Sequence, residues 1–276
     1  MNGQLQRVEN FLMPLCQRGI ALAFSGGVDS TLLLAILSGM QKKNPFPLLV
    51  LNAVSTLQST QDKEAVQKAA VEYGQQVVSL SCNVLALPEV LHNDVLRCYH
   101  CKKLLFKTMV DYAASQGIST LLEGSHADDL KVYRPGRKAL TELGVISPFA
   151  QLGITKKEIR SMAALLKVAV AERPAAPCLA TRFDYGTLLT AEKLQQTAAG
   201  ENFLRKFLPE NADLRLRVHG TLARIEVNKC FFSCLSAHSE EITATLKQIG
   251  FDRITLDLEG FASGSFDSKM KGGKDV

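Results

Sequence analysis

The segment ALAFSGGVDSTLLLAIL, residues 21–37, decides the fold that this sequence predicts. An apolar run over residues 20–24 is typical of a central parallel strand, and the apolar run over residues 31–40 suits a helix packed on that sheet. Between them, Gly26 and Gly27 allow a tight turn at which the backbone can approach another molecule closely. A strand, a glycine turn and a helix start present backbone N–H groups at the positive end of a helix, which favours an anion such as phosphate.

The first half of the chain repeats this order of strand and helix. Apolar strand patterns recur over residues 47–55, 75–82 and 119–125, and helical patterns separate them. This alternation predicts an α/β fold with a Rossmann-like parallel sheet, whose ligands bind at the carboxyl ends of the strands. The glycine turn, Ser55 and Gly124 all fall at such ends, so we expect them to share one site.

The pattern changes after the Pro-rich stretch RPAAP, residues 173–177. Beyond it, helices and strands no longer alternate regularly, which predicts a smaller α+β domain. We therefore expect a first domain over residues 1–172, a cysteine-bearing linker over 173–189, the α+β domain over 190–267, and a disordered Gly- and Lys-rich tail over 268–276.

The strand predicted over residues 213–220 of the second domain carries two arginines on one face. Arg215 and Arg217 alternate with apolar residues, so their side chains project to the same side. Such a pair is ordinarily a solvated face. An anion-binding face is the competing interpretation.

The composition is typical of a folded protein, with 46% hydrophobic and 21% charged residues among 276. A net charge of +5 is too mild to indicate nucleic-acid binding by itself. The chain has no apolar run long enough to span a bilayer and does not begin with the pattern of a signal sequence. We expect a cytoplasmic protein that binds neither nucleic acid nor membrane.

Seven cysteines at irregular spacing favour thiol or metal chemistry over a disulfide framework. In RCYHCKK, Cys98 and Cys101 have the C-x-x-C spacing of a metal or redox pair, at the start of a helix with basic neighbours that lower thiol pKa values. Cys178 lies in a Pro-bounded loop with Arg182 nearby, which suits chemistry better than packing. Three such thiolates suit either a 4Fe-4S cluster with one open iron or zinc.

The other four cysteines are interpreted as packing residues. Cys16 and Cys82 have apolar neighbours, and we expect them in the core. Cys230 and Cys234 are expected to pack beside Phe231 and Phe232.

The hexapeptide SGGVDS resembles the pyrophosphate loop, or PP-loop, of ATP pyrophosphatases of the adenine nucleotide alpha hydrolase kind. The chain contains neither G-x-x-x-x-G-K-[ST] nor G-x-G-x-x-G, so the two commonest nucleotide motifs do not apply. The resemblance implies that Ser25, Gly26, Gly27 and Ser30 hold the pyrophosphate of ATP and that Asp29 helps to hold Mg²⁺. A departing pyrophosphate requires such donors and a cation because it carries several negative charges.

Further motifs extend the resemblance over nearly the entire chain. They are RCYHCKK (97–103), EGSHADD (123–129), YRPGRKA (133–139), LGVISP (143–148), PCLATRFDYGT (177–187), RLRVHGTLARIEV (215–227) and LDLEGFASGS (256–265). In this order they are similar to the LarE-type ATP-dependent sulfur transferases. The resemblance implies that ATP adenylates a carboxylate of pyridinium-3,5-biscarboxylic acid mononucleotide, and that sulfur then converts it to a thiocarboxylate in the nickel-pincer cofactor of lactate racemase.

The same resemblance implies roles for further residues. Gly124, Asp128 and Arg134 match the nucleotide site, and Ser55 is assigned to it by its place after a strand. Arg182, Arg215 and Arg217 match the residues that bind the substrate phosphate, a task suited to guanidinium groups. Glu201 matches an acidic metal contact. Family members assemble as trimers or hexamers, which implies a homo-oligomer.

The family contains two sulfur sources. In one version a single loop cysteine gives up its own sulfur and becomes dehydroalanine; in the other, three cysteines hold a 4Fe-4S cluster that carries an extra sulfide. Because counterparts of Cys98 and Cys101 are absent from the first version, we favour a cluster on Cys98, Cys101 and Cys178. Sacrificial transfer from Cys178 is the alternative.

Three other functions compete with this interpretation. A tRNA thiolase shares the PP-loop but is expected to carry a broad basic face, which the charge of +5 does not suggest. An ammonia-dependent ligase of the NAD or GMP synthetase sort needs no C-x-x-C pair. A nucleotide-binding regulator with structural zinc would bind ATP without releasing pyrophosphate.

Overall fold

Four parallel strands form the sheet of the first half of the chain, in the order β3-β2-β1-β4. Their bounds are β1 (Ile20–Ala23), β2 (Leu48–Val54), β3 (Val77–Ser81) and β4 (Leu121–Leu122). The central strand β1 is buried along its whole length, as its unbroken apolar pattern predicts. This computed structural model describes residues 2–58, 60–130, 136–168, 178–209 and 212–262.

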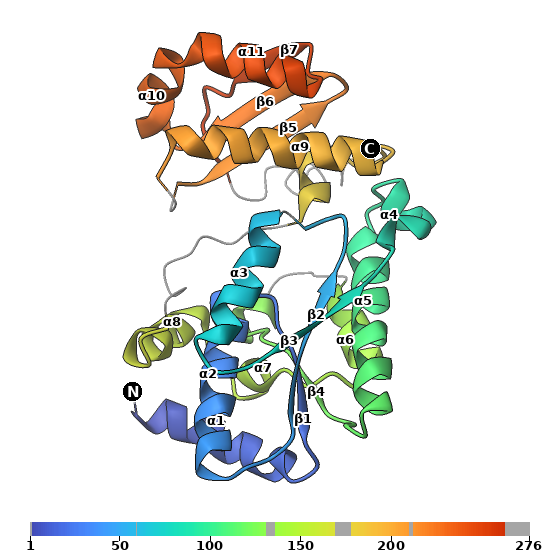
Figure 1. Ribbon diagram of the computed structural model, residues 1–276, viewed down its shortest axis with the longest axis vertical. Helices are drawn as coiled ribbons and strands as arrows, with labels where there is room; N and C mark the ends of the chain where they lie inside the picture. Colours follow the sequence, from blue (N-terminus) through green and yellow to red (C-terminus); the bar gives the residue numbers. More distant parts are fainter. Residues whose placement is uncertain (1, 59, 131–135, 169–177, 210–211, 263–276) are drawn as a thin grey trace, which may run out of the picture. The chain divides into compact units, whose positions relative to one another are not determined.

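Helices cover both faces of this sheet. Figure 1 shows α2, α3 and α8 on one side and α5 and α6 on the other. The helices are α1 (Asn2–Cys16), α2 (Val28–Lys43), α3 (Thr60–Val71), α4 (Pro88–Leu91), α5 (Arg97–Ser115), α6 (Gly136–Glu142), α7 (Pro148–Gln151) and α8 (Lys156–Leu165). The arrangement confirms the predicted α/β fold with a Rossmann-like parallel sheet.

The core lies between the sheet and the helices α1, α2 and α8. Leu12 of α1, Leu33 of α2 and Ile159 of α8 are completely buried and belong to one hydrophobic cluster with Leu22 of β1. The burial of α2 on this side fixes the position of its first turn, which directly follows the glycine turn. None of the helices in the described parts of the chain is long and apolar enough to cross a membrane.

Contacts divide the chain into two compact units, each made of two segments that are not consecutive in sequence. The first contains Met1–Val90 and Val95–Ala175, and the second contains Leu91–Asp94 and Ala176–Val276. The short segment Leu91–Asp94 therefore packs with the later half of the chain. The expected tail over 268–276 and the stretch 173–177 lie outside the described residues.

The second unit contains a three-stranded sheet with helices packed on one face. Strand β5 (Leu214–His219) pairs antiparallel with β6 (Leu222–Val227), which pairs parallel with β7 (Arg253–Leu256). The helices of this unit are α9 (Ala191–Leu204), α10 (Phe232–Ala237) and α11 (Ser239–Ile249). A Cβ at Gly200 of α9 would collide with Leu216 and lie 3.2 Å from Leu246 Cδ2, so α9 lies close to both β5 and α11.

Candidate active site

The glycine turn after β1 has the conformation that its residues predict. Gly26 has φ +71°, and a Cβ there would lie 3.1 Å from Val66 Cγ2 and 3.2 Å from Val66 Cα. Both the left-handed backbone and the close approach require glycine. Gly27 is the N-cap of α2, so the free N–H groups of the first helical turn face the loop.

Two serine hydroxyls meet across this loop. Ser25 Oγ lies 3.1 Å from Ser30 Oγ, and the Ser30 hydroxyl also accepts from Ser25 N at 3.3 Å and donates to the Gly27 carbonyl at 3.1 Å. Asn52, buried in β2, donates to the Phe24 carbonyl at 2.7 Å and ties the end of β1 to its neighbour. The donors of the loop are therefore held in place before any ligand binds, which favours electrostatic stabilisation of an anion.

A cavity of about 300 Å³ opens at the carboxyl ends of β1, β2 and β4. It includes Ser25, Asp29 and Ser30 from the loop and Gly124 from the end of β4. The remaining lining residues are Ala23, Phe24, Leu51, Asn52, Ala53, Gln58, Lys102, Leu105, Phe106, Met109, Glu123, Ser125 and Asp129. The lining combines apolar side chains with polar and charged ones, a mixture suited to a nucleotide with its apolar base and its charged phosphates.

Gly124 is the point of closest approach between β4 and the loop. A Cβ at this position would lie 3.0 Å from Ser30 N and 3.1 Å from both Asp29 C and Asp29 Cβ. The neighbours are mainly backbone atoms, which cannot move without displacing the first turn of α2. The predicted role of Gly124 in the nucleotide site thus has a steric basis.

We expect Gly124→Ala to weaken ATP binding by about tenfold, because overpacking of this kind costs about 1–3 kcal/mol and displaces the loop donors. Calorimetric titration with ATP and Mg²⁺ measures the effect. Gly39→Ala is the matched control, because nothing lies within 4 Å of a Cβ at that helical position. Equal ATP affinity in Gly124→Ala and the wild type would contradict the prediction.

Asp29 forms an ion pair with Lys156, which sequence analysis did not identify. Lys156 Nζ lies 2.6 Å from Asp29 Oδ1 and 2.8 Å from Oδ2. Lys156 is the first residue of α8, whose start is fixed by a capping box between Thr155 and Glu158. The charged stretch TKKEIR, residues 155–160, indicates the start of a helix. It does not show that Lys156 pairs with Asp29, because the two residues are 127 positions apart.

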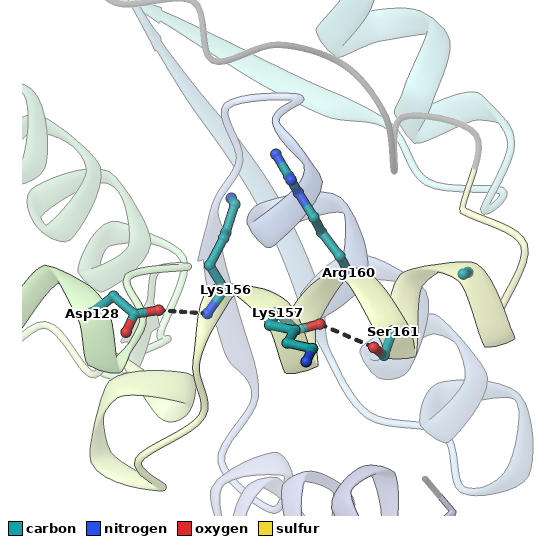
Figure 2. A pocket seen from close by; sticks show the side chains of 6 residues that line it. Asp128, Lys156, Lys157, Arg160 and Ser161 are labelled. Atoms are coloured by element: carbon teal, nitrogen blue, oxygen red, sulfur yellow. Dashed lines mark hydrogen bonds between the residues drawn. The ribbon is translucent and has the colours of Figure 1, made fainter. Parts of the chain in front are cut away.

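A second cavity of about 620 Å³ lies beside this ion pair. Its lining is Asp128, Lys156, Lys157, Arg160, Ser161 and Ala164. Figure 2 shows that Lys156 and Arg160 project to the same side of α8, whereas Lys157 points away from them. The Asp128 carboxylate accepts from Lys156 N at 2.8 Å, so Asp128 caps α8 rather than lining the cavity at the glycine turn.

The other predicted nucleotide residues have different positions. Ser55 is buried just after β2, and its hydroxyl accepts from Leu57 N at 3.3 Å, which stabilises the turn that leads to Gln58. Arg134 lies outside the described residues. Glu123 was not predicted, yet it is buried in the cavity wall and accepts from Ser125 N at 3.0 Å and Ser125 Oγ at 2.8 Å.

The C-x-x-C pair lies in the first turn of α5, as expected. Cys98 is exposed and Cys101 is half-buried. Cys98, Lys102, Leu105 and Met109 recur at helical spacing, so the face of α5 that lines the cavity continues into the cysteine turn. The two thiols therefore lie on the helix face that borders the nucleotide cavity.

An ion network holds this turn of α5 against α6. Lys103 Nζ lies 2.7 Å from Glu142 Oε2, and the Tyr99 hydroxyl donates to the same carboxylate at 2.8 Å. The hydrogen bond from Lys103 lowers the pKa of Glu142, and the same contact raises the pKa of Lys103. A Cβ at Gly136 would lie 3.2 Å from the Cys98 carbonyl, so α6 also abuts the cysteine turn.

Cys178 immediately precedes a short 3-10 helix, η3 (Leu179–Arg182), in the second unit. Cys178 is half-buried, and its carbonyl oxygen accepts hydrogen bonds from Thr181 N at 3.0 Å and from Thr181 Oγ1 at 2.8 Å. Residues 178–181 therefore form a hydrogen-bonded turn that begins at the cysteine. In the described residues, no group of three or more His, Cys, Asp or Glu side chains converges as a metal site.

The three predicted phosphate-binding arginines lie together in the second unit. Arg182, Arg215 and Arg217 are 6%, 7% and 3% exposed, so the solvated-face interpretation of the strand is wrong. The strand alternation correctly places Arg215 and Arg217 on one face, but the loop that carries Arg182 covers that face, and Arg217 Nη1 donates to the Thr181 carbonyl.

Two carboxylates neutralise part of this charge. Arg182 binds Glu201 through Nε–Oε1 at 2.8 Å and Nη2–Oε2 at 2.9 Å, while Arg217 Nε donates to Glu226 Oε2 at 3.0 Å. Glu201 Oε1 also accepts from Leu216 N at 2.9 Å. The Glu201 carboxylate, expected from the resemblance to contact a metal, is thus engaged by Arg182 and the backbone.

Among the described residues, no carboxylate is paired with Arg215 in this way. Its guanidinium stacks on the Phe261 ring at 5.1 Å, and its buried Nε has no hydrogen-bond partner among the described residues. Burial, together with the charges of Arg182 and Arg217, lowers the pKa of Arg215 to about 10. A buried cation with an unpaired N–H donor is suited to bind an anion.

The remaining cysteine predictions have mixed outcomes. Cys16 and Cys82 are buried, which confirms their assignment to the core. Cys230 is exposed, so its predicted packing beside the phenylalanines is wrong: it lies on a 3-10 turn with no buried residue. Cys234 is half-buried, and its thiol donates to the Phe207 carbonyl at 3.2 Å.

Comparison with known proteins identifies the family of this chain. Residues 2–131 match the PP-loop domain family. The chain is 30% identical over 252 residues to the pyridinium-3,5-bisthiocarboxylic acid mononucleotide synthase of Lactiplantibacillus plantarum, covering 91% of this chain and 90% of that protein. It is also 36% identical over 250 residues to an uncharacterized protein of Synechocystis, covering 89% of this chain and 91% of the relative. With a PP-loop cavity, a cysteine turn beside it and this similarity over almost its whole length, the chain belongs to the LarE family of ATP-dependent sulfur transferases.

Proposed function

We propose that this enzyme adenylates a carboxylate of pyridinium-3,5-biscarboxylic acid mononucleotide and converts it to a thiocarboxylate for the nickel-pincer cofactor of lactate racemase. The Lactiplantibacillus relative is named for the synthesis of pyridinium-3,5-bisthiocarboxylic acid mononucleotide, and the corresponding biscarboxylate would be the precursor with the same ring and mononucleotide. The observation that carries the proposal is the continuous face of α5, on which Cys98 and Cys101 follow the residues that line the nucleotide cavity. The two helix thiols and the PP-loop cavity thereby belong to neighbouring parts of the first unit, and the third thiol of the proposal, Cys178, belongs to the second unit.

The first step is acyl adenylation. A carboxylate oxygen of the substrate attacks the α-phosphorus of ATP, the bond to the bridging oxygen breaks, and pyrophosphate leaves with that electron pair. The loop N–H groups, with the hydroxyls of Ser25 and Ser30, stabilise the leaving pyrophosphate. Bound Mg²⁺, held by Asp29, would neutralise the charge that develops on the phosphates.

The second step replaces AMP by sulfur. A sulfur nucleophile attacks the acyl carbon of the adenylate, the C–O bond to AMP breaks, and the thiocarboxylate is released. A 4Fe-4S cluster held by Cys98, Cys101 and Cys178 would supply this sulfur as sulfide, without a change in the oxidation state of the acyl carbon. Thiolates are the ligands that such clusters prefer, and both helix thiols have the required spacing.

In the second unit, Arg182, Arg215 and Arg217 would bind the phosphate of the substrate. Buried guanidinium groups provide several fixed donors, and the positive charges of Arg182 and Arg217 act on the buried Arg215. The assembly into trimers or hexamers and the cytoplasmic location stay predictions.

The test is incubation of the anaerobically purified protein with ATP, Mg²⁺ and the biscarboxylate mononucleotide, with mass spectrometry of the small molecules. We expect AMP and pyrophosphate to appear with a product in which sulfur replaces one carboxylate oxygen. Nicotinate mononucleotide, which carries one ring carboxylate, is the matched control substrate. Release of pyrophosphate without sulfur incorporation, from a colourless protein containing stoichiometric zinc, would contradict the proposal.

The ion pair with Lys156 predicts that Asp29 changes partner when Mg²⁺ and ATP bind. If Asp29 holds Mg²⁺, its two oxygens would no longer be paired with Lys156, and the ammonium would be available to the ATP phosphates. We expect Lys156→Met to weaken ATP binding by about tenfold and to strengthen binding of Mg²⁺ alone. Titration calorimetry with each ligand measures both effects, and Lys157→Met is the control because that side chain points away. Parallel losses for both ligands would contradict the exchange of partners.

A further inference from the structure

The cavity of about 620 Å³ beside α8 is lined mainly by basic side chains. Lys156, Lys157 and Arg160 contribute three positive charges, and Asp128 is the one acidic residue among the described residues that line it. The Asp128 carboxylate already accepts a hydrogen bond from Lys156 N at 2.8 Å. The cavity therefore has an excess of positive charge, which is suited to an anion.

An ion pair connects this cavity with the nucleotide cavity. Asp29 of the PP-loop lines the nucleotide cavity, and Lys156 lines the second cavity. Lys156 Nζ lies 2.6 Å from Asp29 Oδ1, so the two cavities adjoin at this contact. The end of a polyphosphate chain held by the PP-loop would therefore lie near the second cavity.

Arg160 presents an uncompensated charge to this cavity. It lies four residues after Lys156, and Figure 2 shows the two side chains on the same side of α8. Arg160 is exposed, and no hydrogen bond or ion pair joins its guanidinium to any other residue in the described part of the chain. Its N–H donors, which match two phosphate oxygens at once, are therefore open to a ligand.

The positions of these cations are unfavourable for the helix itself. Lys156 and Lys157 lie at the positive end of the α8 dipole, and like charges four residues apart, as in Lys156 and Arg160, repel each other. The acidic residue of this turn, Glu158, is engaged by Thr155 N at 2.8 Å and by Gln4 Nε2 at 2.7 Å. Residues that oppose the local preference of a helix in this way are typical of a functional site.

We propose that Arg160 forms, together with Lys156, a second anion subsite that binds the terminal phosphates of ATP and then the released pyrophosphate. The inference deepens the proposed function and rests on it, because it takes the PP-loop as the place where pyrophosphate leaves. When the bond between the α-phosphorus and the bridging oxygen breaks, the electron pair goes to pyrophosphate, and a guanidinium stabilises that charge. Because Arg160 would contact only the terminal phosphates, it would distinguish ATP from AMP.

The experiment measures binding of two probes to the full-length protein by titration calorimetry. The probes are pyrophosphate with Mg²⁺, and AMP. We expect Arg160→Met to weaken pyrophosphate binding by about tenfold, while AMP binding changes by less than about twofold. Arg160→Lys keeps the charge but loses the planar pair of donors, so pyrophosphate binding should weaken by about threefold. Lys157→Met is the matched control, because it removes one charge from the same helix but its side chain points away from Arg160, and both probes should bind within about twofold of the wild type.

The outcomes separate this inference from the proposed function. Unchanged pyrophosphate binding in Arg160→Met, or an equal loss for both probes, would overturn the second subsite while leaving the PP-loop as the nucleotide site. An equal loss of pyrophosphate binding in Lys157→Met would also overturn it, because the effect would then come from net charge alone. Binding of neither probe by the wild type would reject the PP-loop site and the subsite with it. If Arg160→Met does not fold, as judged by thermal unfolding, Arg160→Lys decides, with its selective loss of pyrophosphate binding still expected.

Discussion

Replacing Cys178 by alanine is expected to reduce sulfur transfer about a thousandfold or more, to the background rate. Both sulfur sources require this thiol, as a cluster ligand in one and as the donor itself in the other. Pyrophosphate release should persist, because the PP-loop and its cavity belong to the first unit. Product mass spectrometry and a pyrophosphate assay on the same sample measure the two steps separately.

Cys98→Ala and Cys101→Ala distinguish the two sources. With a cluster, each substitution should remove the iron absorption band and sulfur transfer together. With sacrificial transfer, both variants should still react once, and the protein should lose the mass of one hydrogen sulfide as Cys178 becomes dehydroalanine. Cys230→Ala is the matched control, because Cys230 is exposed and lies outside the proposed ligand set. Full activity in Cys178→Ala would reject both mechanisms.

The second large effect is expected at Arg215, where function and stability should change in opposite directions. Its pKa is lowered to about 10, mainly by burial, so at neutral pH the charged side chain costs folding free energy. The full shift corresponds to about 3 kcal/mol, and we expect a gain near 2 kcal/mol in Arg215→Met, because some solvent screening remains. This cost is present below pH 10 and falls only as pH rises above it.

The same substitution should weaken phosphate binding about a hundredfold, because it removes a buried guanidinium whose Nε has no hydrogen-bond partner among the described residues. Arg217→Met provides the contrast. Removing Arg217 deprives the buried Glu226 of a partner, so this variant should be less stable by about 3 kcal/mol or more. Urea unfolding and calorimetric titration measure both quantities. A loss of stability in Arg215→Met would show that its charge is compensated in the folded state.

Local sequence signals predicted the parts of this molecule that depend on local structure. The glycine turn was identified correctly because Gly26 and Gly27 meet a conformational requirement within a few residues of the strand. The cysteine turn was also placed correctly at a helix start, because α5 begins at Arg97. In contrast, β4 contains only Leu121–Leu122, because the following Glu123 and Gly124 leave the sheet and line the cavity.

Features that depend on distant contacts were not predictable from one sequence. Alternation placed Arg215 and Arg217 on one face, but it could not reveal that the loop of Thr181 covers that face. Lys156 is separated from Asp29 by more than a hundred residues, and α1 carries no motif that marks it as part of the core. The missing information in each case is which surface packs against which.

The segment Leu91–Asp94 limits how far the second unit can be regarded as an autonomous module. A fragment beginning at Ala176 would lack Asn93 and would leave the carbonyl oxygens of Phe183 and Asp184 without this internal donor. During synthesis, Asn93 leaves the ribosome before residues 180–184, so its hydrogen bonds to their carbonyl oxygens form only after that later segment has been made. Expression of the two halves as separate polypeptides should therefore succeed only if residues 91–94 are supplied to the second.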